Sequence, residues 1–220
     1  MIDEEANQKD DMLRMDHTAE LKLRNAAAVN RLTKLSIDIP ANLILIDTCM
    51  SICEVEADAI VNSANEVMMG GGGMDFEIRQ RAGPGLAREC EMIPVDEFGV
   101  RCYTGKAVVT GAYDLQHPKY IIHTVAPYLD TNGDPQPSLL RDCYVSCMEA
   151  AQRMTVSSVA FPSLGTGYYG YPIAEAAEIA ITTLCDCIRG SQQQGMSVFI
   201  VPYSSLDREA YRKLLRLSLL

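Results

Sequence analysis

The order strand, glycine-rich loop, helix occurs twice in this 220-residue chain. In the first copy, the apolar run at residues 59–61 leads through a polar loop to four glycines at residues 70–73, which a predicted helix follows. In the second copy, a strand at residues 159–161 precedes the loop SLGTGYYGYP at residues 163–172, and a helix follows again. Short apolar strands of this kind are typical of buried parallel sheets. The repeated order therefore predicts an α/β fold with ligand-binding loops at the carboxyl ends of its strands.

Strands and helices continue to alternate along the chain. Strands are predicted at Leu43–Ile46, Ala59–Val61, Ala107–Thr110, Tyr120–Thr124, Val159–Phe161 and Val198–Val201. Helices are predicted at Met74–Arg81, Pro84–Cys90, Ser138–Arg153, Ile173–Ile188 and Arg208–Leu217. This alternation predicts a three-layer α/β/α domain with a largely parallel central sheet.

The first 34 residues differ from this pattern in composition. Residues 1–20 hold seven acids and two bases, a net charge of −5, which is typical of a solvated arm. After them, apolar residues spaced along one helix face predict an amphipathic helix from Thr18 to about Lys34. We therefore expect two parts: an acidic N-terminal arm with a helical extension at residues 1–34, and a single domain at residues 35–220.

The composition excludes several classes of partner. Apolar residues make up 48% of the chain and charged residues 22%, as in ordinary globular domains, and no apolar run approaches the length that spans a bilayer. The formal net charge is −10, whereas proteins bind nucleic acids and anionic membranes through basic faces. We therefore expect no nucleic-acid or membrane partner, a cytoplasmic or nuclear location, and an anionic ligand held by backbone N–H groups.

The eight cysteines lie in otherwise regular segments, and no signal-peptide pattern precedes them. Free thiols in a reducing compartment are therefore expected. Cys143 and Cys147 are one helical turn apart, but no histidine or second cysteine pair stands at zinc spacing. We expect these thiols to pack in the core, and we predict no metal site and no cofactor. Three histidines, His17, His117 and His123, are expected to be structural, because none accompanies a plausible nucleophile.

Polar residues flank the first glycine loop, and tyrosines lie within the second. Asn62 and Asn65 precede the first loop, and Asp75 follows it. Glycines let a ligand approach the backbone, whose N–H groups bind phosphate or diphosphate. An amide and a carboxylate can bind a ribose diol, and the carboxylate can also steer a water molecule. In the second loop, Tyr168 and Tyr169 can cover a sugar, with packing between the layers as the alternative.

The two familiar nucleotide-binding patterns are absent. No GxGxxG follows the first strand, and no GxxxxGK[ST] supplies a phosphate-binding lysine. Tyr203 follows the apolar strand near the C-terminus, where its ring can stack on a base or pack in the core. The residues therefore predict a cleft for ribose beside diphosphate, and they argue against both Rossmann-type redox chemistry and P-loop hydrolysis.

Seven blocks of sequence between about Ser51 and Tyr211 resemble the MacroD-type branch of the macrodomain family. The blocks occur in the family's order: DAIVNSAN, GGGG-x-D, RAGPGLAREC, TGKAVVTGAY, KYIIHTVAP, SVAFPSLGTGYYGYP and REAYR. This resemblance implies an ADP-ribose-binding macrodomain with a mixed, about six-stranded central sheet and a cleft at the strand ends. It also implies metal-independent hydrolysis of the ester that joins ADP-ribose to a protein acidic side chain, and of O-acetyl-ADP-ribose.

The resemblance assigns roles to individual residues. Asn65 would bind the distal ribose, and Asp75 would orient or activate the attacking water. Tyr169 would shape the distal-ribose pocket, and Tyr203 would stack on adenine. The other predicted ligand-binding residues are Ser51, Ile52, Asn62, Gly71, Gly72, Gly73, Met74, Ser163, Gly165, Thr166, Gly167 and Tyr168. The implied partners are ADP-ribose, mono-ADP-ribosylated proteins and O-acetyl-ADP-ribose, and we expect a monomer.

Two departures from the family pattern bear on this prediction. The family often has an aspartate that accepts a hydrogen bond from adenine, where this chain has Ser51; we favour Ser51 slightly over Asp47 as the acceptor. After the catalytic acid the family commonly has Gly-Ala-Ile-His, whereas this chain has Phe76 and, one helical turn after Asp75, Arg79. Phe76 adds bulk, and Arg79 is placed to pair with the acid. A module that binds ADP-ribose without hydrolysing it is therefore the alternative function.

Overall fold

The predicted strands and helices are present in the structure, a computed structural model that describes residues 20–191 and 195–215. The elements are β1 (Leu43–Leu45), the 3-10 helix η1 (Ile52–Glu54), β2 (Ala59–Ser63), α2 (Gly73–Ala82), α3 (Pro84–Met92), β3 (Ala107–Gly111), β4 (Tyr120–Thr124), α4 (Pro137–Arg153), β5 (Ser158–Pro162), α5 (Ile173–Gly190), β6 (Ser197–Val201) and α6 (Ser205–Leu215). One further helix covers residues 20–31. The predicted acidic arm and His17 lie outside the described residues. The prediction that the last helix begins at Arg208 was wrong by three residues.

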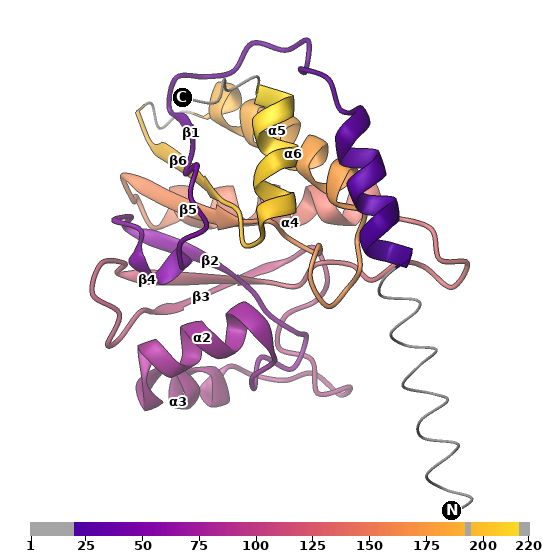
Figure 1. Ribbon diagram of the computed structural model, residues 1–220. Helices are drawn as coiled ribbons and strands as arrows, with labels where there is room; N and C mark the ends of the chain where they lie inside the picture. The colour runs from indigo at the N-terminus through magenta and orange to yellow at the C-terminus, as the bar shows by residue number, and fades with distance from the viewer. Residues whose placement is uncertain (1–19, 192–194, 216–220) are drawn as a thin grey trace, which may run out of the picture.

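Within the described residues, six strands form one sheet in the order β1-β6-β5-β2-β4-β3. The neighbours β1, β6, β5, β2 and β4 pair in parallel, and β3 runs antiparallel to β4 at one edge. Helices α4, α5 and α6 cover one face of the sheet, and α2 and α3 cover the other (Figure 1). The predicted three-layer α/β/α fold with a mixed, six-stranded sheet is thus confirmed.

Alternate side chains of each buried strand enter two separate hydrophobic cores. On β2, Ala59 and Val61 pack with residues of α4, α5 and α6, whereas Ile60 packs with residues of α2 and α3. This follows from the two-residue period of a strand, which points successive side chains to opposite faces. The cysteines within the described residues are free, and Cys143 and Cys147 are fully buried in α4. The expectation that these two thiols pack in the core is confirmed.

The helix of residues 20–31 lies against the start of α5 (Figure 1). Its Asn25 Oδ1 accepts a hydrogen bond from the Ile173 backbone N–H at 3.1 Å. On the same helix Val29 is fully buried in the core beneath α4, α5 and α6. The helical extension is therefore packed onto the domain, although the proposed boundary between residues 34 and 35 stays a prediction.

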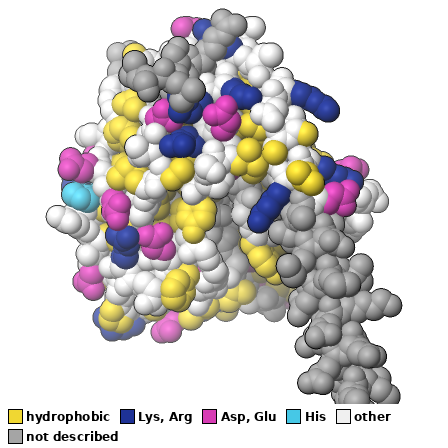
Figure 2. Space-filling view, viewed as in Figure 1, with side chains coloured by type: hydrophobic (Ala, Val, Ile, Leu, Met, Phe, Trp, Pro, Cys, Tyr) yellow, Lys and Arg dark blue, Asp and Glu magenta, His cyan; other side chains and the backbone are white. Residues whose placement is uncertain are grey.

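The molecular surface carries mixed charge on the face in view, where lysine and arginine side chains are interspersed with aspartate and glutamate (Figure 2). Among the residues that the structure describes, no helix combines the length and the apolar character needed to cross a bilayer. In the same part of the chain, no group of three or more His, Cys, Asp or Glu side chains is arranged to hold a metal ion.

Candidate active site

Three adjacent parallel strands, β6, β5 and β2, end at the same edge of the sheet. Carboxyl ends of parallel strands are where ligands bind in open α/β sheets, and a cleft of about 510 Å³ lies there. Its volume falls within the range of small-molecule sites. The cleft is lined by Ser63, Ala64, Asn65, Gly71, Gly72, Gly73, Met74, Asp75, Tyr128, Ser163, Gly165, Thr166, Gly167, Tyr168, Tyr169, Ile173, Tyr203, Ser204 and Asp207.

Most of the predicted site residues share this cleft, but three of them do not line it: Ser51, Ile52 and Asn62. Sequence reasoning missed six residues that do: Ser63, Ala64, Tyr128, Ile173, Ser204 and Asp207. The sequence contains signals for three of these six residues. Ser204 and Asp207 stand at the Ser-x-x-Asp spacing of a capping box, and Tyr128 follows β4, the strand next to β2.

Asp75 lies in the first turn of α2 and is 3% exposed. Arg79 Nε donates hydrogen bonds to Asp75 Oδ1 at 3.2 Å and to Oδ2 at 3.1 Å. A third hydrogen bond, from Asn62 Nδ2 to Oδ1, measures 2.6 Å. The predicted pairing one turn apart is therefore present, and it is partly buried, because the side chains of Arg79 and Asp75 are 14% and 4% exposed. Each charge compensates the other in surroundings where an unpaired charge would be costly.

A buried histidine stands behind this carboxylate. His123 on β4 is fully buried, and its burial, with a smaller contribution from the charge of Arg79, lowers its pKa to about 3. The ring is therefore neutral near pH 7. Its Nδ1 faces Asn62 Nδ2 at 3.1 Å and accepts the second amide proton, so Nε2–H donates to Thr110 Oγ1 at 2.8 Å. The hydrogen-bonded chain runs from β3 to Asp75 and holds that acid in place.

The loop between β2 and the glycines is fixed by side-chain hydrogen bonds. Asn65 Oδ1 accepts from Met68 N at 2.9 Å, and Asn65 Nδ2 donates to Gly70 O at 2.7 Å. Arg79 Nη2 donates to Met68 O at 2.8 Å. These contacts hold Met68, which is fully buried and has a left-handed φ of 55°, unusual for a non-glycine residue. Asn65 thus orders the cleft wall, and its binding of ribose stays a prediction.

Two glycines are required by the space around them. A Cβ on Gly71 would stand 3.3 Å from Asp75 Oδ2 and 3.6 Å from Asn65 Nδ2. Gly165 has a φ of 79°, and a Cβ there would stand 3.2 Å from Tyr171 Cβ. By contrast, Phe76 is 57% exposed and does not line the cleft. The expectation that Phe76 adds bulk at the site was therefore wrong, because its side chain points to solvent.

The second glycine loop contributes an aromatic wall. The Tyr169 ring packs on Tyr128 with centroids 3.9 Å apart and planes tilted by 36°. Its hydroxyl makes a long hydrogen bond of 3.5 Å to Ala64 O, and burial raises the pKa of Tyr169. Tyr168 beside it is 94% exposed, so it is free to close over a ligand. Packing between the layers was the alternative prediction for these two tyrosines. It is partly correct for Tyr169, whose ring packs on Tyr128.

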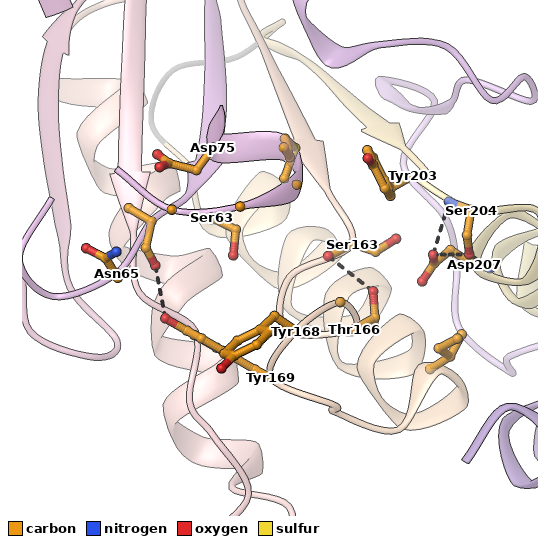
Figure 3. A pocket seen from close by; sticks show the side chains of 18 of the residues that line it. Ser63, Asn65, Asp75, Ser163, Thr166, Tyr168, Tyr169, Tyr203, Ser204 and Asp207 are labelled. Carbon is orange, nitrogen blue, oxygen red and sulfur yellow. Dashed lines mark hydrogen bonds between the residues drawn. The ribbon is translucent and has the colours of Figure 1, made fainter. Parts of the chain in front are cut away.

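The far end of the cleft is formed by the residues after β6. Tyr203 is 60% exposed there. Ser204 N donates to Asp207 Oδ2 at 3.2 Å, the Ser204 hydroxyl donates to the same oxygen, and Asp207 N donates to Ser204 Oγ at 3.1 Å. This capping box explains why α6 begins at Ser205. Figure 3 shows Tyr203, Ser204 and Asp207 at one end of the cleft and Asn65 and Asp75 at the other.

Neither candidate for adenine recognition lies in the cleft wall. Ser51 Oγ accepts a hydrogen bond from Cys53 N at 3.2 Å and caps η1. Asp47 Oδ2 pairs with Arg212 Nη1 at 3.5 Å. Both side chains therefore have partners within the protein, and the choice between them stays open.

Residues 61–180 of the chain match the Macro domain family. A protein named O-acetyl-ADP-ribose deacetylase from Cronobacter turicensis is 40% identical over 164 residues, which cover 74% of this chain and 91% of that protein. The Oceanobacillus iheyensis macrodomain with ADP superimposes with a TM-score of 0.72 at 33% identity, covering 84% of this chain and 96% of that chain. For the Trypanosoma brucei macrodomain in complex with ADP-ribose, the TM-score is 0.69 at 30% identity, with coverages of 84% and 74%. With the glycine loops, strand-end cleft and sheet order described above, these likenesses show that the chain belongs to the Macro domain family.

Proposed function

We propose that this protein binds ADP-ribose in the cleft and hydrolyses its esters. The substrates are O-acetyl-ADP-ribose and proteins that carry mono-ADP-ribose on an acidic side chain. The observation that carries the proposal is Asp75, a carboxylate fixed in the cleft wall beside glycine backbone and Asn65. Support comes from the relative named O-acetyl-ADP-ribose deacetylase and from the macrodomain solved with ADP-ribose.

The order of groups along the cleft suits the parts of ADP-ribose. Asn65 and Asp75 stand at the end proposed for the distal ribose, and Tyr203 offers a ring face to adenine at the other end (Figure 3). Between them the glycine backbone would hold the diphosphate. Gly72 caps α2 without a side-chain acceptor, so the N–H groups of the first helical turn are available to an anion.

Asp75 would act on the water that attacks the ester. Its carboxylate would accept a hydrogen bond from the water, take a proton as the water adds to the ester carbonyl, and return that proton to the ribose oxygen as the ester C–O bond breaks. Arg79 Nε donates to both oxygens of this carboxylate, and the Asn62 amide fixes its orientation. The products are ADP-ribose and a carboxylic acid, and the scheme uses no metal ion.

The test is release of ADP-ribose from glutamate-linked mono-ADP-ribosylated protein, and deacetylation of O-acetyl-ADP-ribose, with EDTA present. Asp75→Ala should lower turnover of both esters by about 10²- to 10⁴-fold, the usual contribution of a general base. Asp186→Ala is the control, because this carboxylate is 61% exposed on α5. A wild-type rate no higher than that of Asp75→Ala would end the enzyme proposal for that ester.

The second candidate function is an ADP-ribose reader that does not turn the ligand over. It is favoured by Arg79, whose Nε occupies lone pairs on both Asp75 oxygens, leaving fewer acceptor sites for a water molecule. Calorimetry that shows ADP-ribose binding without turnover would select this function. Under it, Arg79→His should create measurable hydrolysis, because imidazole leaves one carboxylate oxygen free.

A further inference from the structure

Asp207 presents an unused hydrogen-bond acceptor at the cleft wall. The residue is 4% exposed, and its enclosed Oδ1 has no hydrogen-bond partner among the residues that the structure describes. We propose that this carboxylate binds a hydroxyl of the adenosine ribose and makes the protein reject ADP-ribose that carries a phosphate on that ribose. The proposal rests on the proposed function, because it assumes that ADP-ribose is the ligand.

The capping of α6 accounts for only one oxygen of Asp207. Oδ2 accepts from both the backbone and the hydroxyl of Ser204, which completes the capping box. Oδ1 takes no part in it. A buried polar atom without a partner costs free energy, and native structures often keep such atoms where a ligand satisfies them. Helix capping therefore explains why an acid stands here, but not why half of it is unused.

In the described part of the chain, the Asp207 carboxylate also has no countercharge. Within the described residues, no lysine, arginine or histidine nitrogen forms an ion pair with its carboxylate; nearby on α6, Arg212 pairs with Asp47 and Lys213 with Glu209. A helix N-terminus alone would attract a phosphate. With Asp207 in its first turn, this terminus is instead suited to neutral hydroxyl groups, which donate to a carboxylate.

The position of Asp207 matches the middle of a nucleoside diphosphate. Tyr203 would hold the base and the Gly165–Gly167 loop the diphosphate, and the ribose is covalently joined to both. Figure 3 shows Ser204 and Asp207 next to Tyr203, on the side of Ser163 and Thr166. The ribose therefore lies against the first turn of α6. Oδ1 is enclosed, so it reaches a hydroxyl by rotation about the Cβ–Cγ bond of Asp207, a broad torsion, which also shifts Oδ2 relative to Ser204. In dinucleotide-binding sites, an acidic side chain accepts a hydrogen bond from a ribose hydroxyl in the same way.

The first test needs only the wild-type protein. Calorimetry would compare ADP-ribose with its adenosine-side 2′-deoxy, 3′-deoxy and 2′-phosphate forms. We expect one deoxy form to bind about tenfold more weakly, which corresponds to one lost hydrogen bond. The 2′-phosphate form should bind about a hundredfold more weakly, because like charges meet. Deoxy and phosphorylated ligands that all bind within twofold of ADP-ribose would overturn the proposal.

Variants then assign the effect to Asp207. Asp207→Asn keeps the shape and removes the charge, so the penalty for the 2′-phosphate should fall at least about tenfold while ADP-ribose still binds. Glu209→Gln is the control, because it removes a charge from the same helix at a residue that pairs with Lys213 and does not line the cleft, so it should keep the ligand ratio. An unchanged ratio in Asp207→Asn overturns the proposal. Absence of ADP-ribose binding in the wild type would instead overturn the proposed function, and this inference with it.

Discussion

Two carboxylates at opposite ends of the cleft are buried to the same extent but held differently. Asp75 is 3% exposed and Asp207 is 4% exposed. Asp75 accepts hydrogen bonds on both oxygens and pairs with Arg79. Asp207 accepts on one oxygen only, and no ion pair reaches it from the described residues. Burial alone therefore does not define the role of an acid, because the partners decide which lone pairs and how much charge remain for a ligand.

Local spacing sets this difference. Arg79 follows Asp75 by four residues on α2, where helical side chains meet, so the acid is supplied with its countercharge by its own helix. Asp207 follows Ser204 by three residues at a helix start, where the spacing supplies a cap instead. Asp75 is thereby held in one position, whereas Asp207 can still accept a hydrogen bond from a ligand.

Replacing either acid with asparagine should produce the largest effect on stability, and the loss should be much greater for Asp75 than for Asp207. Asp75→Asn leaves the partly buried Arg79 without its countercharge, so we expect the free energy of unfolding to fall by about 3 kcal/mol. Asp207→Asn weakens a cap and should cost about 1 kcal/mol. Urea denaturation measures both, with the exposed Asp186→Asn expected to stay within about 0.5 kcal/mol of wild type. Equal losses at the two ends would refute the comparison.

The second-largest effect should be a loss of stability at low pH, caused by His123 behind Asp75. His123 has a pKa of about 3 in the folded protein, below the ordinary 6.5. Below pH 6.5 the unfolded chain binds a proton that the folded chain does not, so stability is full above 6.5 and falls as the pH drops toward 3. At pH 5 the expected loss is about 2 kcal/mol.

Urea midpoints at pH 7 and pH 5 would measure this loss. His123→Gln should remove most of the difference between the two pH values, although it lowers stability at pH 7 because the contacts with Asn62 and Thr110 are altered. The partly exposed His117 provides the control, and His117→Gln should keep the wild-type pH dependence. A wild-type protein equally stable at both pH values would contradict the assignment of a neutral, buried His123.

The sheet and most of the site could be predicted from sequence because their signals are local. Apolar runs of strand length gave β2, β4 and β6, and glycine loops after strands located the cleft. Parallel neighbours bring such loops together whatever the order of the strands in the sheet. The Asp75–Arg79 pair was also predictable, since it depends only on helical spacing.

The remaining parts of the site depend on contacts between distant strands or on the cap of the last helix. Asn62 links Asp75 to His123 over separations of 13 and 61 residues, and no local period encodes such a contact. Asp207 lies before Arg208, the predicted start of the last helix, although the Ser204-x-x-Asp207 capping spacing indicates an earlier start.

A smaller effect should come from the backbone beside Asp75. In Gly71→Ala the new Cβ would stand 3.3 Å from Asp75 Oδ2, so the carboxylate must shift by a few tenths of an ångström. We expect turnover to fall about tenfold, because small misplacements of reacting groups are costly. A Cβ on Gly190, which does not line the cleft, would meet no atom within 4 Å, so Gly190→Ala should have the smaller effect. Equal rates for the two variants would show that Asp75 does not need its present position.

The smallest effect should come from outside the cleft, where the helix of residues 20–31 supports the second glycine loop. Asn25→Ala leaves the Ile173 backbone N–H at the start of α5 without its acceptor, which should cost about 1 kcal/mol of unfolding free energy. Arg24→Ala is the matched control, because Arg24 is exposed and pairs only with Glu20 on its own helix among the described residues; it should change stability by less than about 0.5 kcal/mol. Ile173 lines the cleft, so Asn25→Ala should also weaken ADP-ribose binding slightly. If ligand affinity is unchanged while stability falls, the N-terminal helix supports the fold without shaping the cleft between the two acids.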